Sequence, residues 1–262
     1  MNSIAWKLRE HSDIVKAGFK HSLIRDALSS ENRATSYIKW KESRCNLTLD
    51  AVRQLGCNIS EDTPKTAFSE VFFEGVYNIR EFTPFRGDVV IDVGASYGDT
   101  AIWWSKVFGA RVIGFEPLDD VYRIFQKNIE LNNADVTAYN IALGNGTNIS
   151  GSTKGKMLSL DTSPGSMNFP TQRLDDFSFQ RVDLLKIDVE GFECEVLAGA
   201  TNTINKFQPK IIVEMHSKEL TKKCNKLLAD LGYHIKVVGR KMKLKNSWMD
   251  LVQNVFYMPP MN

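Results

Sequence analysis

From residue 89 onward, short apolar runs alternate with longer segments in which apolar residues recur at helical spacing. Runs of this length are typical of buried parallel strands, and the segments between them suit the helices that connect such strands. We therefore predict an α/β fold with a mostly parallel sheet and helices on both faces. The expected strands are 89–93, 111–115, 136–141, 183–187, 210–214, 233–239 and 253–258, and the expected helices are 99–108, 119–132, 193–206 and 218–231.

The last two expected strands have no helical segment between them. They are predicted to form a terminal hairpin, which makes one strand antiparallel and completes a seven-stranded, Rossmann-like sheet. A loop rich in glycine is expected between 141 and 183, and 72–77 reads as an edge strand or hairpin that leads into the domain.

The first part of the chain has a different pattern. It is polar and charged, with apolar residues at helical spacing and a helix stop at Gly56. We interpret 1–66 as a helical extension and 67–262 as the main domain. The extension is a candidate for covering the cofactor cleft, for contacting substrate or for forming a homodimer, and the sequence does not choose among these roles.

A tight turn follows the first strand of the sheet. Gly94 and Gly98 frame it, and glycine permits positive φ angles and a close approach of backbone to ligand. The next strand ends in Glu116, about twenty positions after the turn, where a carboxylate is placed to hydrogen-bond both hydroxyls of a ribose. The segment therefore predicts a cofactor that contains adenosine.

The residues of the turn favour a methyl donor over a dinucleotide. A dinucleotide site needs glycine in the middle of the turn, where this chain has Ser96, and Asp92 would repel a pyrophosphate. S-adenosylmethionine has a sulfonium, an amino group and no phosphate. A nicotinamide dehydrogenase and a domain without a cofactor stay as weaker alternatives.

Polar side chains gather at the predicted carboxyl ends of the later strands. Lys186, Asp188 and Glu190 come from one strand and its end, and Glu214 and His216 from the next. Asp188 and Glu190 share strand parity and are expected to face the same side. These groups suit a base and a substrate clamp; a metal is the less favoured role, because only one histidine is present and the acids have competing roles.

Composition excludes several other classes of protein. The formal charge of +2 implies no strong field for nucleic acid, although basic residues cluster at 240–245 near Trp248. The four cysteines form no Cys-x-x-Cys pair, which argues against a zinc finger and fits free thiols in a reducing compartment. We expect no membrane segment and a cytoplasmic location, because no apolar run approaches the ~18 residues of a span.

The same segments resemble the FkbM family of S-adenosylmethionine-dependent methyltransferases. The resemblance covers about residues 70 to 217 and rests on the segments 90–100, 114–117, 128–132, 140–144, 174–175, 185–193 and 214–216. It implies the class I methyltransferase fold, with Gly94 to Gly98 under the methionine part of the cofactor, Glu116 on the ribose and 140–142 beside the adenine. The cofactor-binding residues expected on these grounds are Asp92, Gly94, Ala95, Ser96, Gly98, Thr100, Glu116, Pro117, Ile141, Ala142 and Asp188.

The family resemblance also implies a reaction. Similar members are mostly O-methyltransferases of sugars, polyketides and other hydroxylated metabolites, and the chain lacks the Asn-Pro-Pro-Tyr type of motif that holds an amide or amine. We expect in-line methyl transfer to a hydroxyl, with His216 as first choice of base because its ordinary pKa is about 6.5. Asp188 or Glu190 is second, and Lys186 is expected to pair with an acid. The alternative is an RNA methyltransferase, or a silent RNA-binding protein that uses the basic segment.

Overall fold

The computed structural model describes residues 56–64, 79–154, 157–160, 167–239 and 253–260, with Arg53, Ala67, Val71 and Tyr77. For 149–154, 157–160 and 167–168 it describes the backbone only. Most of the helical extension expected over 1–66, the strand expected at 72–77 apart from Tyr77, and the basic segment with Trp248 lie outside the described residues.

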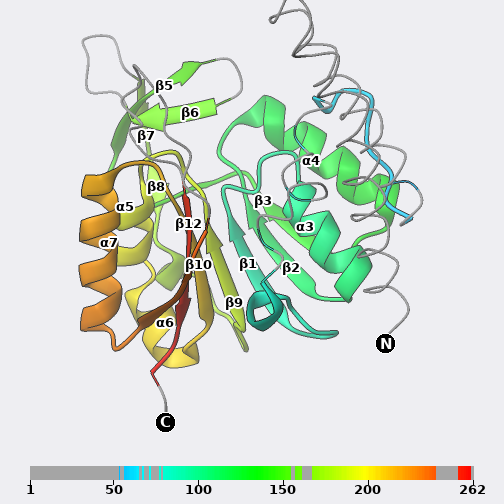
Figure 1. Ribbon diagram of the computed structural model, residues 1–262. Coiled ribbons are helices and arrows are strands. Elements are labelled where there is room, and N and C mark those ends of the chain that lie inside the picture. Colours follow the sequence, from blue (N-terminus) through cyan, green and yellow to red (C-terminus); the bar gives the residue numbers. More distant parts are fainter. Residues whose placement is uncertain are drawn as a thin grey trace, which may run out of the picture.

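A seven-stranded sheet forms the centre of the molecule (Figure 1). Its order is β11-β12-β10-β9-β1-β2-β3, and β12 is antiparallel to both of its neighbours while the other pairs are parallel. This confirms the predicted class I methyltransferase sheet with its terminal hairpin. The strands are β1 (Val89–Val93), β2 (Arg111–Phe115), β3 (Val136–Tyr139), β9 (Leu184–Ile187), β10 (Lys210–Met215), β11 (His234–Val238) and β12 (Gln253–Met258).

Alternate residues of the central strands enter two different cores. Val90 and Leu184 belong to one buried cluster, and the residues that follow them, Ile91 and Leu185, belong to the other. Successive side chains of a strand point to opposite faces, so continuous apolar runs are what a sheet covered on both faces requires.

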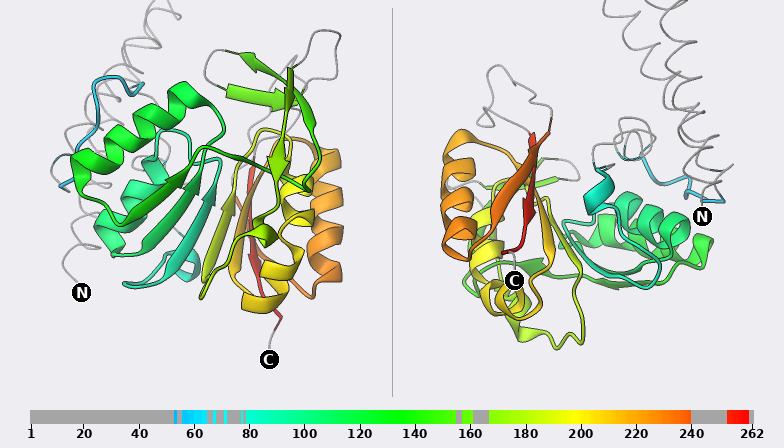
Figure 2. Two further views of the ribbon diagram at one scale, coloured as in Figure 1. Left: turned by 180° about the vertical axis from the view of Figure 1, so that it is seen from behind. Right: turned by 60° about the horizontal axis from the view of Figure 1, so that its bottom comes forward.

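Two groups of helices cover these faces (Figures 1 and 2). The first cluster contains Ala101 and Trp103 of α3 (Asp99–Trp103) and Phe125 of α4 (Asp119–Asn132). The second contains apolar residues of α5 (Glu193–Ala198), α6 (Thr201–Phe207) and α7 (Lys218–Asp230). The helix expected over 99–108 continues from α3 as a π-helical turn, Trp104–Phe108.

The single helix expected over 193–206 is wrong, because the chain breaks between α5 and α6. Gly199 lies at the break, and a Cβ there would stand 1.8 Å from the carbonyl oxygen of Gly144. The carboxylate of Asp175 starts α6 by accepting hydrogen bonds from the backbone N–H groups of Asn202 and Thr203, at 3.0 and 2.8 Å. A cap from a distant segment is invisible to helical periodicity.

The glycine-rich loop expected between 141 and 183 is also wrong. It contains a three-stranded antiparallel sheet of β5 (Ile149–Lys154), β6 (Met157–Leu160) and β7 (Met167–Phe169), and a parallel pair of β4 (Ala142–Leu143) and β8 (Thr171–Gln172). Two residues, one of them Gly155, separate β5 from β6, and a two-residue connection with glycine is a hairpin signal. The several glycines of the segment favoured one continuous loop instead. Figure 1 shows this small sheet at the end of the main sheet where the parallel strands finish.

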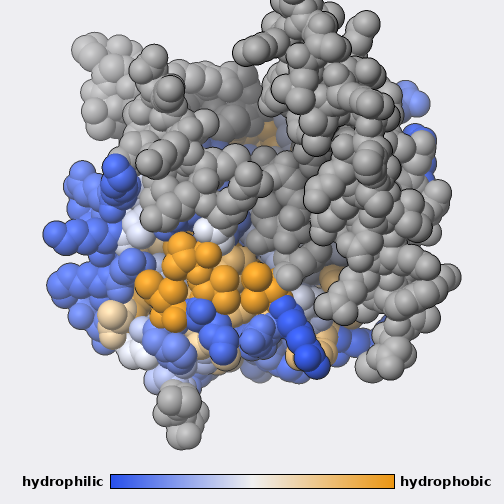
Figure 3. Space-filling view, viewed as in Figure 1, coloured by the Kyte–Doolittle hydropathy of each residue, from blue (hydrophilic) through white to orange (hydrophobic). Residues whose placement is uncertain are grey.

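Within the described residues, no helix has the length and apolar character needed to cross a membrane. Figure 3 shows an apolar area on the described part of one face. The edge strand β11 carries two exposed apolar residues, Ile235 and Val238, with 45% and 47% of their surface exposed.

Candidate active site

The site lies at the carboxyl ends of the parallel strands. β1 pairs with β2 on one side and with β9 on the other, so the order of the chain reverses at β1. Open α/β sheets bind their ligands at such a reversal, outside the strand ends. The segments that follow β1, β2, β9 and β10 all meet there.

The turn after β1 has the predicted backbone. Gly94 and Gly98 have φ angles of 76° and 84°, and Ser96 between them has 50°. The missing Cβ of Gly94 leaves room for the backbone of Asp188, whose carbonyl oxygen would be 1.8 Å away, and that of Gly98 leaves room for the ring of Phe125 at 2.2 Å. The glycines were expected to permit approach of a ligand; the close approach that the structure shows is that of the protein to itself.

Glu116 is joined to this turn directly. Its carboxylate accepts hydrogen bonds from the backbone N–H groups of Ser96, at 3.0 Å, and Leu118, at 2.9 Å. Burial raises the pKa of Glu116 to about 7, although these two hydrogen bonds act to lower it. A carboxylate held beside the turn by its own backbone matches the position expected of a ribose ligand.

Asp92 is paired within the protein. Its carboxylate is fully buried, and the Nζ of Lys186 lies 2.9 Å from Oδ1 and donates to the carbonyl oxygen of Gly94 at 3.1 Å. Burial opposes the charge of Lys186, but Asp92 and Asp188 outweigh it and raise the pKa of the amine. The expected pairing of Lys186 with an acid is confirmed. The cation that faces Asp92 is therefore Lys186, which links the aspartate to the backbone of the turn at Gly94.

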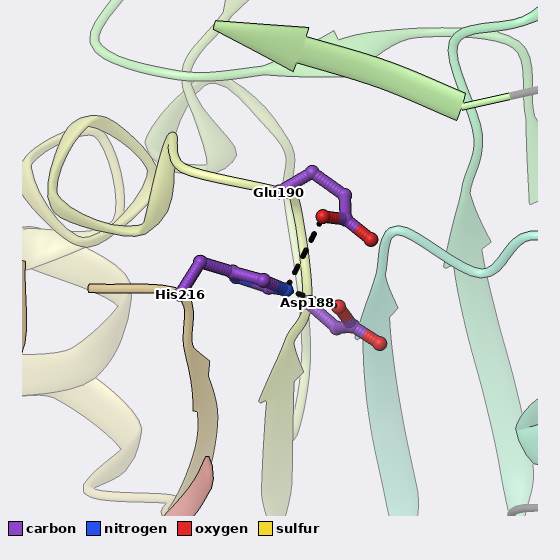
Figure 4. Close-up of side chains that lie close together, drawn as sticks. All are labelled: Asp188, Glu190 and His216. Atoms are coloured by element: carbon purple, nitrogen blue, oxygen red, sulfur yellow. Dashed lines mark ion pairs between the residues drawn. The ribbon is translucent and has the colours of Figure 1, made fainter. Parts of the chain in front are cut away.

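Asp188, Glu190 and His216 converge at the ends of β9 and β10 (Figure 4). The Nε2 of His216 lies 3.4 Å from Oε2 of Glu190 and 3.9 Å from Oδ1 of Asp188. The expected common orientation of the two acids is confirmed, but its cause is different. β9 ends at Ile187, and Glu190 turns inward because its φ angle is 53°, in the left-handed region that side chains rarely adopt.

Glu193 fixes the other side of the imidazole. Its fully buried carboxylate lies 2.7 Å from Nδ1 of His216 and also accepts the backbone N–H of Gly191. Burial alone would lower the pKa of His216, but Glu193, Asp188 and Glu190 together raise it to about 10. The histidine is thus a cation at neutral pH, and the expected pKa near 6.5 is wrong. Its role as the base stays a prediction without that support.

Tyr77 is a site residue that the sequence did not indicate. Its side chain is buried, and its hydroxyl lies 3.5 Å from a carboxylate oxygen of Asp188 and 3.5 Å from one of Glu214. A tyrosine in an apolar segment far upstream carries no local signal of this position, since only the fold brings it to the strand ends.

The match to known families decides what kind of enzyme this site belongs to. Residues 92–235, more than half of the chain, match the family described as "Methyltransferase FkbM domain". The chain belongs to the FkbM methyltransferase family.

Two fungal relatives agree with the family assignment. "Methyltransferase sdnD" of Sordaria araneosa is 25% identical over 223 residues, which are 68% of this chain and 85% of the relative. "Methyltransferase 1" of Beauveria bassiana (strain ARSEF 2860) is 25% identical over 179 residues, 56% of this chain and 71% of the relative.

One solved structure supports the fold, and a second shows similarity alone. A methyltransferase from Pyrococcus furiosus superposes with a TM-score of 0.50 at 16% identity, over 84% of this chain and 98% of that chain. Methyltransferase FkbM from Methylobacillus flagellatus KT gives a TM-score of 0.46 at 18% identity, over 82% of this chain. The chain spans 60% of the length of that second protein.

In this FkbM methyltransferase the remaining residues expected to bind the cofactor divide into two groups. Gly94, Ser96, Pro117, Ile141 and Asp188 are partly exposed, and their positions follow the ends of β1, β2, β3 and β9. Ala95, Thr100 and Ala142 are buried.

Proposed function

We propose that this FkbM methyltransferase transfers the methyl group of S-adenosylmethionine to a hydroxyl oxygen of a small metabolite or sugar. The observation that supports the cofactor best is the link between Glu116 and the backbone N–H of Ser96, at 3.0 Å. It couples a ribose-binding carboxylate to the turn on which the methionine part would lie, at the reversal of strand order where such ligands bind.

The side chains at the ends of β9 and β10 favour a hydroxyl as the methyl acceptor. Asp188, Glu190 and His216 stand together at the ends of β9 and β10, beside the turn, where an acceptor would meet the methyl group. The sulfonium is already a good leaving group, so the protein has mainly to align the reactants, a contribution on the order of 7–11 kcal/mol. Because His216 is protonated at neutral pH, the carboxylates of Asp188 and Glu190 are the better acceptors for the hydroxyl proton.

Calorimetry tests the cofactor. We expect S-adenosylmethionine and S-adenosylhomocysteine to bind, and Glu116→Ala to weaken both by roughly tenfold or more, because a carboxylate that accepts two hydroxyl hydrogen bonds is lost. Glu130→Ala, an exposed acid of α4, is the control and should bind like the parent protein. Binding of NAD in place of these ligands, or equal affinities in the two variants, would contradict the proposal.

Transfer of a labelled methyl group tests the acceptor. The label is expected in hydroxylated metabolites or sugars and absent from RNA incubated under the same conditions. An RNA substrate was the alternative suggested by the basic segment 240–245, and no described residue supports it. Label in RNA with a steep dependence on salt would reverse this order of preference.

A further inference from the structure

We propose that Asp188, Glu190 and His216 form a binding site for one divalent transition-metal cation, with Mn²⁺ as the probe. Each residue offers one ligand atom, and the three atoms lie within 4.8 Å of one another. The inference deepens the proposed function, since it assigns a ligand to the place where the acceptor would bind; the binding itself is independent of cofactor and acceptor.

The distances are close to those of a coordination shell. Protein ligands lie about 2.0–2.2 Å from such cations, so neighbouring donor atoms in one shell are about 3 to 3.6 Å apart. The Nε2 of His216 is 3.4 Å from Oε2 of Glu190 and 3.9 Å from Oδ1 of Asp188. Small rotations of the two carboxylates complete the geometry. Figure 4 shows both carboxylates pointing toward the imidazole edge.

The orientation of His216 separates this cluster from an ordinary group of acids. Nδ1 is held by Glu193 at 2.7 Å, and that carboxylate is itself buried and fixed by the backbone N–H of Gly191. Histidines that bind metals commonly donate their second ring N–H to a carboxylate in this way, which fixes the tautomer and directs the free nitrogen at the cation. Here the nitrogen so directed is Nε2, the one that faces Asp188 and Glu190.

The charges suit a dication. Binding of a cation displaces the proton that Nε2 of His216 carries at neutral pH, so the bound form has two carboxylates and a neutral imidazole, with two negative charges. Among the described residues, the ammonium group of Lys186 lies 2.9 Å from Asp92 and 3.6 Å from Asp188. Asp92 thus compensates Lys186 and leaves the cluster acidic. Mixed imidazole and carboxylate ligands favour Mn²⁺, Fe²⁺, Co²⁺ or Zn²⁺ over Ca²⁺ and Mg²⁺.

Three protein ligands leave positions open for an acceptor oxygen. A hydroxyl bound there would lose its proton to water, since a bound cation lowers the pKa of an O–H group. The oxygen would then form its bond to the methyl carbon as the carbon–sulfur bond breaks, and S-adenosylhomocysteine would leave. With the cation bound, Asp188 and Glu190 would therefore be its ligands, and water would replace them as the acceptor of the hydroxyl proton.

Titration with Mn²⁺, followed by electron paramagnetic resonance, tests the site in protein freed of metal and without cofactor or acceptor. We expect one Mn²⁺ per chain. The affinity for Mn²⁺ should fall by roughly tenfold or more in Asp188→Asn, Glu190→Gln and His216→Ala. Glu130→Gln is the matched control and should bind as the parent does. Mg²⁺ is expected to displace Mn²⁺ poorly, whereas Zn²⁺ competes.

Two outcomes would overturn the inference: no bound Mn²⁺ in the parent protein, or unchanged binding in folded Glu190→Gln. Glu190 follows β9 in a loop and has 24% of its side chain exposed, so we expect the Glu190→Gln variant to fold. Mn²⁺ binding together with failure of the cofactor calorimetry would reject the proposed function and leave the metal site. The reverse pattern would reject the metal alone.

Discussion

Glu116 combines near-complete burial with a function that requires its carboxylate. Only 7% of its surface is exposed, and burial raises its pKa to about 7. The two backbone hydrogen bonds that it accepts reduce the free-energy cost of burying the ionised carboxylate but do not remove it. Around neutrality this group is therefore divided between its neutral and ionised forms in the protein without ligand.

The stability of the fold should record this titration. The pKa in the folded state lies above the ordinary value of about 4.5, so the contribution of Glu116 is fully present below pH 4.5 and is lost as the pH rises through 7. Relative to Glu116→Gln, the parent should lose on the order of 3 kcal/mol of unfolding free energy between pH 4.5 and 8. Urea denaturation of both proteins at several pH values measures the difference. Parallel profiles would show that Glu116 does not titrate in this range.

The sequence predicts that Asp188, Glu190 and His216 lie together at neighbouring strand ends, as the structure shows, but it does not predict their partners. Each residue was found because it follows an apolar run, and strand ends of a parallel sheet meet at one edge. Glu193 and Tyr77 carry no such mark, although they contact His216 and Asp188. The contact with Glu193, together with the charges of Asp188 and Glu190, raises the pKa of His216 to about 10 and reverses the argument that its ordinary value supported.

At the scale of elements, α6 depends on a residue outside itself. Asp175, in the 3₁₀ turn that follows β8, accepts hydrogen bonds from the backbone N–H groups of Asn202 and Thr203 and from the hydroxyl of Thr203. A carboxylate at the start of a helix satisfies donors that the helix leaves unpaired. The Leu-Asp pair at 174–175, one of the segments that resemble the family, thus has a structural role.

Asp175→Ala should therefore destabilise the protein by about 1–2 kcal/mol, the usual effect of removing such a cap. Asp120→Ala is the control, because Asp120 is exposed and pairs only with the neighbouring Arg123 among the described contacts. Chemical denaturation gives both values. Equal stabilities would mean that Thr201 and its neighbours start α6 unaided.

The strands of the main sheet and the helices α4 and α7 lie within two residues of the bounds that periodicity predicts. β1, β9 and β10 are mostly apolar because each contributes to two cores, and α4 and α7 end within one residue of expectation. β5, β6 and β7 were missed because they pair mainly with one another and have little apolar patterning.

At the scale of the whole molecule, β12 joins the end of the sheet to its centre. It pairs with β10 over five residues and with β11 on its other side, and Phe256 and Tyr257 enter opposite cores. β11 has no other partner in the seven-stranded sheet.

Removal of residues 253–262 should consequently prevent a cooperative fold, whereas removal of 261–262 should leave it intact. The first change exposes the edge of β10 and uncovers both cores, and the second leaves every described strand in place. Circular dichroism during heating and resistance to protease compare the two. A cooperative transition in the shorter protein would show that five parallel strands suffice.

The position of β12 between β10 and β11 has a consequence for synthesis on the ribosome. β11 emerges before the strand that it must pair with, and the edge of β10 stays open until residues 253–258 have been made. His216 follows β10 directly and contacts both acids of the proposed site. It therefore lies at the end of an unpaired strand edge while residues 217–252 are translated. Nascent chains of this enzyme would thus expose an aggregation-prone strand edge until residues 253–258 emerge, which is when a chaperone would be needed.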